Sequence, residues 1–184
     1  NEQWVNENFQ RKQIERGIQK INMKLDDVIV VSDLDEIPNP EILKKIKDKK
    51  INIGISRLEM DFYYYNLYSK FEDKWDKSII FTYKEKIKYK FDFNYPRNGI
   101  KSGCIKNGGW HLSYFGDSNF IGNKLKEFAH QEFNKDEFTS LKNIEKRIKN
   151  NKDLFNRKTN MKHIPLDKNN NLPPKYEIYL KDFY

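Results

Sequence analysis

The chain has 184 residues, which is long enough for one domain with a substantial hydrophobic core. Its 35 Lys and Arg residues exceed its 27 Asp and Glu residues, and the formal net charge of +8 favours acidic partners such as nucleotides, nucleic acid or anionic lipid. The single cysteine, Cys104, excludes an intrachain disulfide framework, and no apolar run approaches the roughly 18 residues needed to cross a bilayer.

The first predicted elements are two helices on either side of a short apolar strand. Helical spacing of apolar residues predicts an amphipathic helix over residues 6–21, with its inward face formed by Phe9, Ile14, Ile18 and Ile21. The apolar run at residues 28–31 predicts a strand. Asn39 suits the N-cap of the next helix and Pro40 its first position, so we expect this helix to extend to Lys49.

The middle of the chain has the pattern of strands. Ile51, Ile53 and Ile55 alternate with polar or small residues, which predicts a strand over residues 51–56. Segments rich in β-branched and aromatic residues predict further strands over residues 58–68, 78–83 and 105–112.

Two helices and an irregular tail complete the chain. Apolar spacing predicts helices over residues 119–133 and 137–150. Asparagines at 169–171 and the pair Pro173-Pro174 disfavour a helix before Tyr176, so the tail, residues 165–184, is expected to be irregular. Since no linker or repeat divides the sequence, we predict a single domain over residues 1–184.

Two carboxylates, one residue apart, follow the strand at residues 28–31. Asp33, Asp35 and the adjoining Glu36 would repel one another unless a cation or solvent separates their charges. Mg²⁺ and Mn²⁺ sit on one or two carboxylates and leave their other positions to water and substrate phosphates. The pattern therefore indicates a metal site for a nucleotide-linked substrate, and a solvated turn before a helix is the alternative.

The order of the predicted elements is that of an α/β fold. Ligand sites in such sheets lie at the carboxyl ends of the strands, where Asp33 and Asp35 fall. The layout is typical of nucleotide-sugar enzymes, in which an earlier strand-helix-strand unit holds the nucleotide base. Only one helix precedes Asp33, so we expect the chain to be a fragment that lacks the N-terminal strand-helix unit of its domain.

A second cluster of functional residue types lies at residues 107–117. The paired glycines Gly108 and Gly109 allow a backbone to approach a ligand closely. Trp110 offers a flat face on which a sugar ring could stack, and a position in the core is its alternative. His111 is a candidate metal ligand or donor to a phosphate.

The other two histidines have different surroundings. His130 stands two residues before Glu132 on the predicted helix 119–133, and this spacing brings the two side chains together only at a helix end. His163 is expected at the surface.

These blocks resemble glycosyltransferase family 17, the β-1,4-mannosyl-glycoprotein β-1,4-N-acetylglucosaminyltransferases. The resemblance rests on residues 26–38 with their Ser-Asp-Leu-Asp-Glu-Ile-Pro, on Gly-Trp-His-Leu-Ser-Tyr at 109–114, on Phe-Ala-His-Gln-Glu at 128–132, and on the tail from residue 174. The blocks follow the family's order and extend over about residues 4–184. The family's upstream region is absent, and residues 62–101 match only loosely.

The resemblance implies a GT-A-like, Rossmann-like fold, UDP-N-acetylglucosamine (UDP-GlcNAc) as donor, a glycan or glycoprotein acceptor, Mn²⁺ or Mg²⁺, and inversion at the anomeric carbon. Asp35 is then expected to bind the metal directly, Asp33 to contact the ribose or the metal through water, and His111 to be a third ligand. Arg97 or Lys101 is expected to neutralise diphosphate charge, with surface solvation as the alternative for each.

An inverting transfer needs a general base that takes the proton of the acceptor hydroxyl during attack. Asp117, in the loop after the Gly-Gly-Trp-His block, is the first candidate and Glu132 the second, although Asp117 could equally cap the following helix. Glu36 is expected to orient the metal turn or to interact with the dipole of the helix downstream.

Two other functions stay open from the residues alone. An aspartate-nucleophile phosphatase also carries Asp-x-Asp after an apolar strand, but Pro38 stands where its Thr is expected. A basic module that binds nucleic acid would use the many Lys, Tyr and Phe residues, although core packing explains the aromatic residues more simply. The abundance of Lys, Asn and Ile favours a microbial or viral, cytoplasmic enzyme, whereas a eukaryotic relative of the family would lie in the Golgi lumen.

Overall fold

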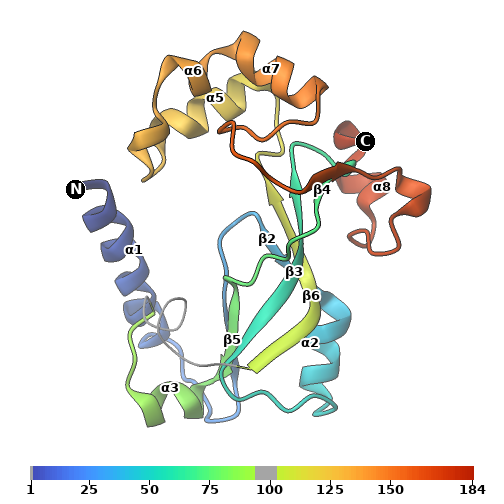
Figure 1. Cartoon of the computed structure of the whole chain (residues 1–184). Coiled ribbons are helices and arrows are strands. Elements are labelled where there is room, and N and C mark those ends of the chain that lie inside the picture. Colours follow the sequence, from blue (N-terminus) through green and yellow to red (C-terminus); the bar gives the residue numbers. More distant parts are fainter. Residues whose placement is uncertain (1, 94–102) are drawn as a thin grey trace. The chain divides into compact units, whose positions relative to one another are not determined.

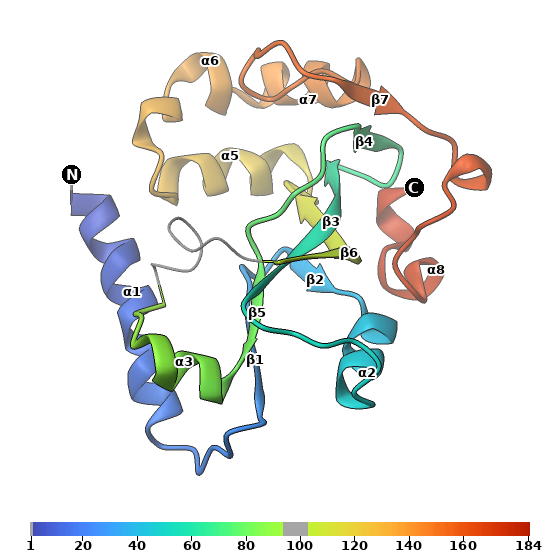
Figure 2. The ribbon, with the colours of Figure 1, turned by 60° about the horizontal axis from the view of Figure 1, so that its bottom comes forward.

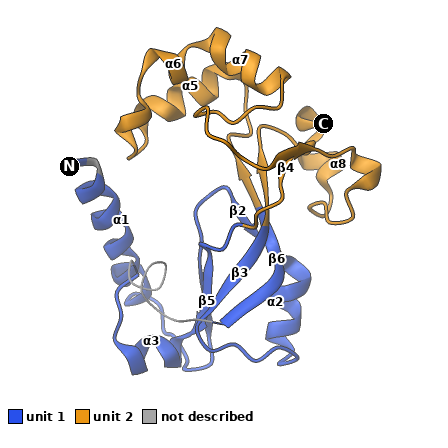
Figure 3. Ribbon diagram, in the orientation of Figure 1, with its two compact units in different colours: residues 1–60, 75–110 blue, residues 61–74, 111–184 orange. Residues whose placement is uncertain are grey.

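The computed structural model describes residues 2–93 and 103–184 and contains both helices and strands, which confirms the α/β class (Figure 1). The chain divides into two compact units, residues 1–60 with 75–110 and residues 61–74 with 111–184 (Figure 3). Two strands, β3 (Ser56–Tyr64) and β6 (Gly103–Ser113), continue from the first unit into the second. The single domain over residues 1–184 stays a prediction.

The first unit contains antiparallel strand pairs. β1 (Val28–Val31) pairs with β5 (Ile79–Thr82), so that Val28 lies opposite Thr82, and β5 pairs in turn with the start of β3. The short β2 (Glu36–Pro38) pairs with β6, and β6 also pairs with β3. β1 is therefore an edge strand in this order, and the acidic turn joins it to β2.

Apolar clusters lie on the two faces of this part of the sheet. One cluster packs Ile55 with Ile29, Val31, Ile79 and Phe81. The other packs Ile53 with Leu58, Met60, Ile80 and two residues of the second helix, Ile42 and Ile46. Residues 51–55 thus supply side chains to both clusters without forming a strand, and the strand predicted there is wrong.

The first helix differs from its prediction at both ends. α1 (Glu2–Ile18) begins earlier than residue 6 and ends before residue 21. Ile14 and Ile18 pack against an apolar cluster as predicted, but Phe9 and Ile21 are exposed, so their inward placement is wrong. α1 lies beside α3 (Tyr83–Tyr89), which the sequence did not predict (Figure 2), and Lys86 Nζ binds Glu15 Oε2 at 2.8 Å.

The second helix follows its local sequence signals closely. α2 (Pro40–Lys47) begins with proline, and the Asn39 side-chain oxygen accepts from the Glu41 N–H at 3.0 Å. The predicted cap is therefore confirmed. The Asn39 amide also donates to the backbone oxygen of Asn107 at 3.1 Å, which ties the start of α2 to β6.

The second unit combines a small sheet with a group of helices. β4 (Ser69–Phe71) pairs with the end of β3 and with β7 (Met161–His163), both antiparallel. The helices α5 (Ser118–Glu127), α6 (Asp136–Thr139) and α7 (Leu141–Lys149) pack in one apolar cluster with aromatic residues of β3 and β4, and their buried side chains are Ile121, Leu125, Phe138 and Ile144. His163 is exposed, as predicted, and stacks on Tyr68 with ring centroids 5.2 Å apart.

Both predicted helices of this unit are shorter than expected. α5 ends at Glu127, because the Gln131 side chain donates to the backbone oxygens of Lys126 and Phe128 and turns the chain into the 3₁₀ helix η1 (Gln131–Phe133). The helix expected over residues 137–150 is interrupted at Ser140, whose backbone is extended. The tail is less irregular than expected, because it contains three short helices, η2 (Leu166–Lys168), α8 (Tyr176–Tyr179) and η3 (Lys181–Phe183).

Replacing Gly109 by alanine should destabilise the fold. Gly109 has φ +151°, and an added Cβ would lie 2.1 Å from the backbone oxygen of Ile37 in β2. We expect Gly109→Ala to lower the free energy of unfolding by at least about 2 kcal/mol, measured by urea denaturation. Gly54→Ala is the matched control, because no atom lies within 4 Å of its added Cβ. An equal loss of stability in both variants would contradict the close packing of Gly109 against β2.

Candidate functional site

The acidic motif forms the turn between β1 and β2. The Glu36 N–H donates to the backbone oxygen of Asp33 at 3.0 Å, which closes the turn. Asp33 and Asp35 are half-buried, whereas Leu34 between them is 99% exposed. Because so exposed a side chain cannot fix the turn by packing, other contacts must hold the backbone in place.

Those contacts come from Glu36, whose carboxylate is buried. Oε2 accepts from the Asp33 N–H at 2.8 Å and from Ser78 Oγ at 2.6 Å, and Oε1 accepts from Trp75 Nε1 at 2.6 Å. Burying a carboxylate is costly unless hydrogen bonds satisfy it, and these donors do so. Glu36 therefore orients the acidic turn and ties it to the segment before β5. Orienting this turn was one of the two roles expected of Glu36.

Asp33 also contacts the first helix. Its Oδ1 accepts from Arg11 Nη2 at 3.1 Å, and the same guanidinium binds Glu7. The Arg11 charge offsets the repulsion between Asp33 and the neighbouring carboxylates.

Changing Glu36 to glutamine should loosen this turn. In the variant, an NH₂ group replaces one of the two carboxylate oxygens. If it replaces Oε2, it faces the donors Asp33 N–H and Ser78 Oγ, and if it replaces Oε1, it faces the donor Trp75 Nε1. We expect a loss of about 2 kcal/mol in the free energy of unfolding, measured by chemical denaturation.

The exposed Glu41→Gln serves as the control for this variant and should be near neutral. If the two variants were equally stable, the role given to Glu36 would be wrong.

The paired glycines serve the packing of β6. An added Cβ on Gly108 would lie 2.8 Å from Cα of Leu58 in β3, and the one on Gly109 would meet β2. The two glycines therefore allow β6 to approach β3 and β2 closely. Trp110 is 2% exposed, and this burial agrees with the core position that the sequence left open.

His111 is the first residue of β6 in the second unit. It is buried, and its ring stacks on Phe62 with centroids 4.9 Å apart. Within residues 2–93 and 103–184, no group of three or more His, Cys, Asp or Glu side chains is arranged to hold a metal ion. Since Asp33 and Asp35 belong to the first unit, the three-residue ligand set stays a prediction. Arg97 and Lys101 lie outside the described residues.

The two candidate bases have different partners. Asp117 is the N-cap of α5, and its Oδ1 accepts from the Phe120 N–H at 2.7 Å. Glu132 lies in η1, where its Oε1 is 2.8 Å from His130 Nδ1. The pair forms because α5 has already ended. The hydrogen bond from His130 lowers the pKa of Glu132.

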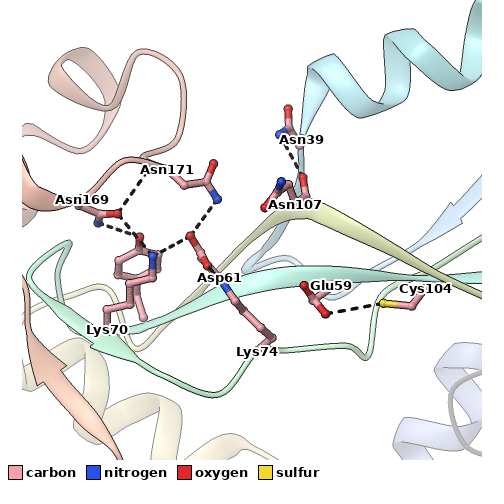
Figure 4. A network of polar contacts seen from close by, with 10 residues as sticks. Asn39, Glu59, Asp61, Lys70, Lys74, Cys104, Asn107, Asn169 and Asn171 are labelled. Atoms are coloured by element: carbon pink, nitrogen blue, oxygen red, sulfur yellow. Dashed lines mark hydrogen bonds and ion pairs between the residues drawn. The ribbon is translucent and has the colours of Figure 1, made fainter. Parts of the chain in front are cut away.

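A buried carboxylate in the second unit had no signal in the sequence. Asp61 in β3 accepts from Lys70 and Asn171, each at 2.8 Å, and pairs with Lys74 (Figure 4). Burial alone would raise the pKa of Asp61, but these hydrogen bonds hold it below the ordinary value. Asn169 extends the network by donating to Tyr63 Oη at 2.8 Å. The network anchors the tail to β3 and β4.

Asp61→Asn should weaken the fold in a pH-dependent way. Because the folded-state pKa lies below the ordinary 3.8, the pairing stabilises the chain fully above about pH 3.8 and is lost as the pH falls through the folded-state pKa. Near neutral pH we expect a loss of about 3 kcal/mol. The difference in melting temperature between wild type and variant should narrow below pH 4.

The exposed Asp167→Asn is the control for this comparison. A difference between wild type and Asp61→Asn that is constant from neutral to acid pH would contradict the ionised pairing.

Comparison with known families decides the class of the protein. The sequence model of glycosyltransferase family 17 matches residues 1–161. The chain belongs to glycosyltransferase family 17. The match leaves residues 162–184 outside it, and the searches of curated proteins and of solved structures found no significant match.

Family 17 membership makes the protein a glycosyltransferase, with a sugar donor and a glycan acceptor. The transferase was one of the three functions that the residues alone left open, and the family match supports it. No helix in the described part of the chain is both long enough and apolar enough to span a membrane.

Proposed function

We propose that this family 17 member is a metal-dependent, inverting transferase that moves N-acetylglucosamine from UDP-GlcNAc to a hydroxyl of a glycan or glycoprotein. The observation that carries the proposal is the turn at Asp33 to Asp35, which places two carboxylates directly after an apolar strand. A GT-A-like arrangement is part of the proposal, and the mixed α/β content of the structure is compatible with it.

The donor side of the site is assigned to the acidic turn. Its residues fit Mn²⁺ or Mg²⁺, which take carboxylate oxygens and complete their coordination with water and phosphate oxygens. Asp35 would bind the ion directly, while Asp33, which pairs with Arg11, would contact the ribose or reach the ion through water. The ion, when bound, would stabilise the charge on the leaving UDP. His111 is kept as the candidate third ligand.

The acceptor side needs a base, and we assign this role to Asp117. In the transfer, a bond forms between the acceptor oxygen and the anomeric carbon, the bond from that carbon to UDP breaks, and Asp117 takes the hydroxyl proton. Glu132 is kept as the second candidate, and its Oε1 lies 2.8 Å from His130 Nδ1. The N-cap bond of Asp117 uses Oδ1 and would hold the carboxylate in position.

Release of UDP from UDP-GlcNAc, with and without Mn²⁺, tests this function. The wild type should release UDP only with the metal, and Asp35→Asn should reduce the rate about 100-fold or more. Its folding stability should stay close to that of the wild type, because Asp35 lies in a partly exposed turn.

Asp26→Asn is the matched control, since Asp26 is an exposed carboxylate shortly before the same strand. It should retain the wild-type rate. Metal-independent release, or full activity of Asp35→Asn, would overturn the assignment.

A further inference from the structure

The second unit contains a pocket of about 720 Å³ that the donor site does not use. Its walls come from the turn between β3 and β4, from the β6–α5 connection, from α7 and from the tail. Aromatic residues from several segments line this pocket. Besides the buried Tyr65, they are Tyr68, Phe115, Phe120, Phe183 and Tyr184. All belong to the second unit.

Contacts within the unit hold the pocket walls in place. Phe183 lies 5.2 Å from Phe115 between ring centroids, and its backbone oxygen accepts from the Leu67 N–H at 2.9 Å. The Asn66 side-chain oxygen accepts from the N–H groups of Tyr68 and Ser69, both at 3.0 Å, and fixes the β3–β4 turn. These contacts position the rings of Phe115 and Phe183 and the turn that carries Tyr68.

Two rings of the lining stay open to solvent. Phe120 is 51% exposed and Tyr184 is 42% exposed, although both are large and apolar. The Phe120 ring lies against Gly116, where an added Cβ would be 2.2 Å from Cδ1 of the ring. Gly116 thus gives Phe120 the room to lie at the pocket wall.

The polar groups of the lining are acidic or neutral. Asp117 and Asp182 contribute carboxylates, and Asn66 contributes an amide. Carboxylates accept hydrogen bonds from hydroxyl groups but repel phosphates, so this lining is unsuited to a nucleoside diphosphate. Aromatic faces combined with a few hydrogen-bond acceptors match a pyranose ring, which has an apolar C–H face and a rim of hydroxyl groups.

We propose that this pocket holds a hexopyranose unit of the acceptor glycan, stacked on Phe120, with Asp117 accepting from one of its hydroxyl groups. The inference rests on the proposed function and adds the place and class of the acceptor. The wall formed by Asp182 to Tyr184 lies beyond residues 1–161, the part matched by the family. Acceptor selection is therefore partly determined by a segment outside the family match.

Saturation-transfer NMR with defined disaccharides tests the pocket without donor or metal. The probes are N,N′-diacetylchitobiose, mannobiose, cellobiose and lactose, each added to the whole chain. At least one should bind, and Phe120→Ala should raise its dissociation constant about tenfold, equal to about 1.4 kcal/mol. Gly116→Ala should weaken binding too, because the new Cβ displaces the same ring.

Tyr179→Ala is the control, since this aromatic residue is 72% exposed and lies outside the pocket lining. It should bind the disaccharide as the wild type does. A folded state of each variant is checked by circular dichroism, and exposed Phe120 is not needed for the core.

Several outcomes would overturn the proposal. They are no binding of any probe, unchanged binding in both Phe120→Ala and Gly116→Ala, or displacement of the bound disaccharide by UDP. Because this experiment contains neither UDP-GlcNAc nor Mn²⁺, failure of UDP release would contradict the proposed function and leave the binding result standing.

Discussion

The buried carboxylate of Glu36 is the constraint on which the acidic turn, and with it the proposed donor site, depends. Its two oxygens accept from the backbone of Asp33, from Ser78 and from Trp75, so the acidic turn and the segment before β5 meet at one side chain. Leaving any of these donors unsatisfied would cost about 1–3 kcal/mol. The turn that carries Asp33 and Asp35 is thereby preorganised, which a site that binds a small, strongly hydrated ion requires.

The remaining features of the first unit support the same turn. Arg11 places a positive charge against Asp33, and the two glycines of β6 let that strand pack closely on β2 and β3. In the second unit, the network around Asp61 has a comparable anchoring role. It attaches Asn169 and Asn171 of the tail to β3, and the tail in turn forms one wall of the aromatic pocket.

Features that depend on neighbouring residues were predictable from the sequence. The cap of α2 by Asn39, the strand before Asp33 and the general α/β class all follow from local patterns, and the structure confirms them. The alternation of Ile51, Ile53 and Ile55 was misleading. These side chains pack into two different apolar clusters, and this packing gives an alternating apolar pattern although the segment forms no strand. The end of α5 was missed because it depends on the Gln131 side chain.

Long-range contacts explain what sequence could not supply. Glu36 meets Ser78 across 42 residues, and Asp61 meets Asn171 across 110 residues, with no spacing rule to connect either pair. The roles of Asp117 and Trp110 were each left between two alternatives. The structure shows Asp117 as a helix cap and Trp110 as a buried residue, and the cap leaves the role of base to experiment.

The most direct test of the account is binding of Mn²⁺ by electron paramagnetic resonance, with UDP present and absent. Wild-type protein should bind the Mn²⁺–UDP complex, and Asp35→Asn should not, because the carboxylate that completes the coordination is removed. Equal binding by both proteins, or no binding by the folded wild type, would contradict the assignment of the donor site to the turn at Asp33 to Asp35.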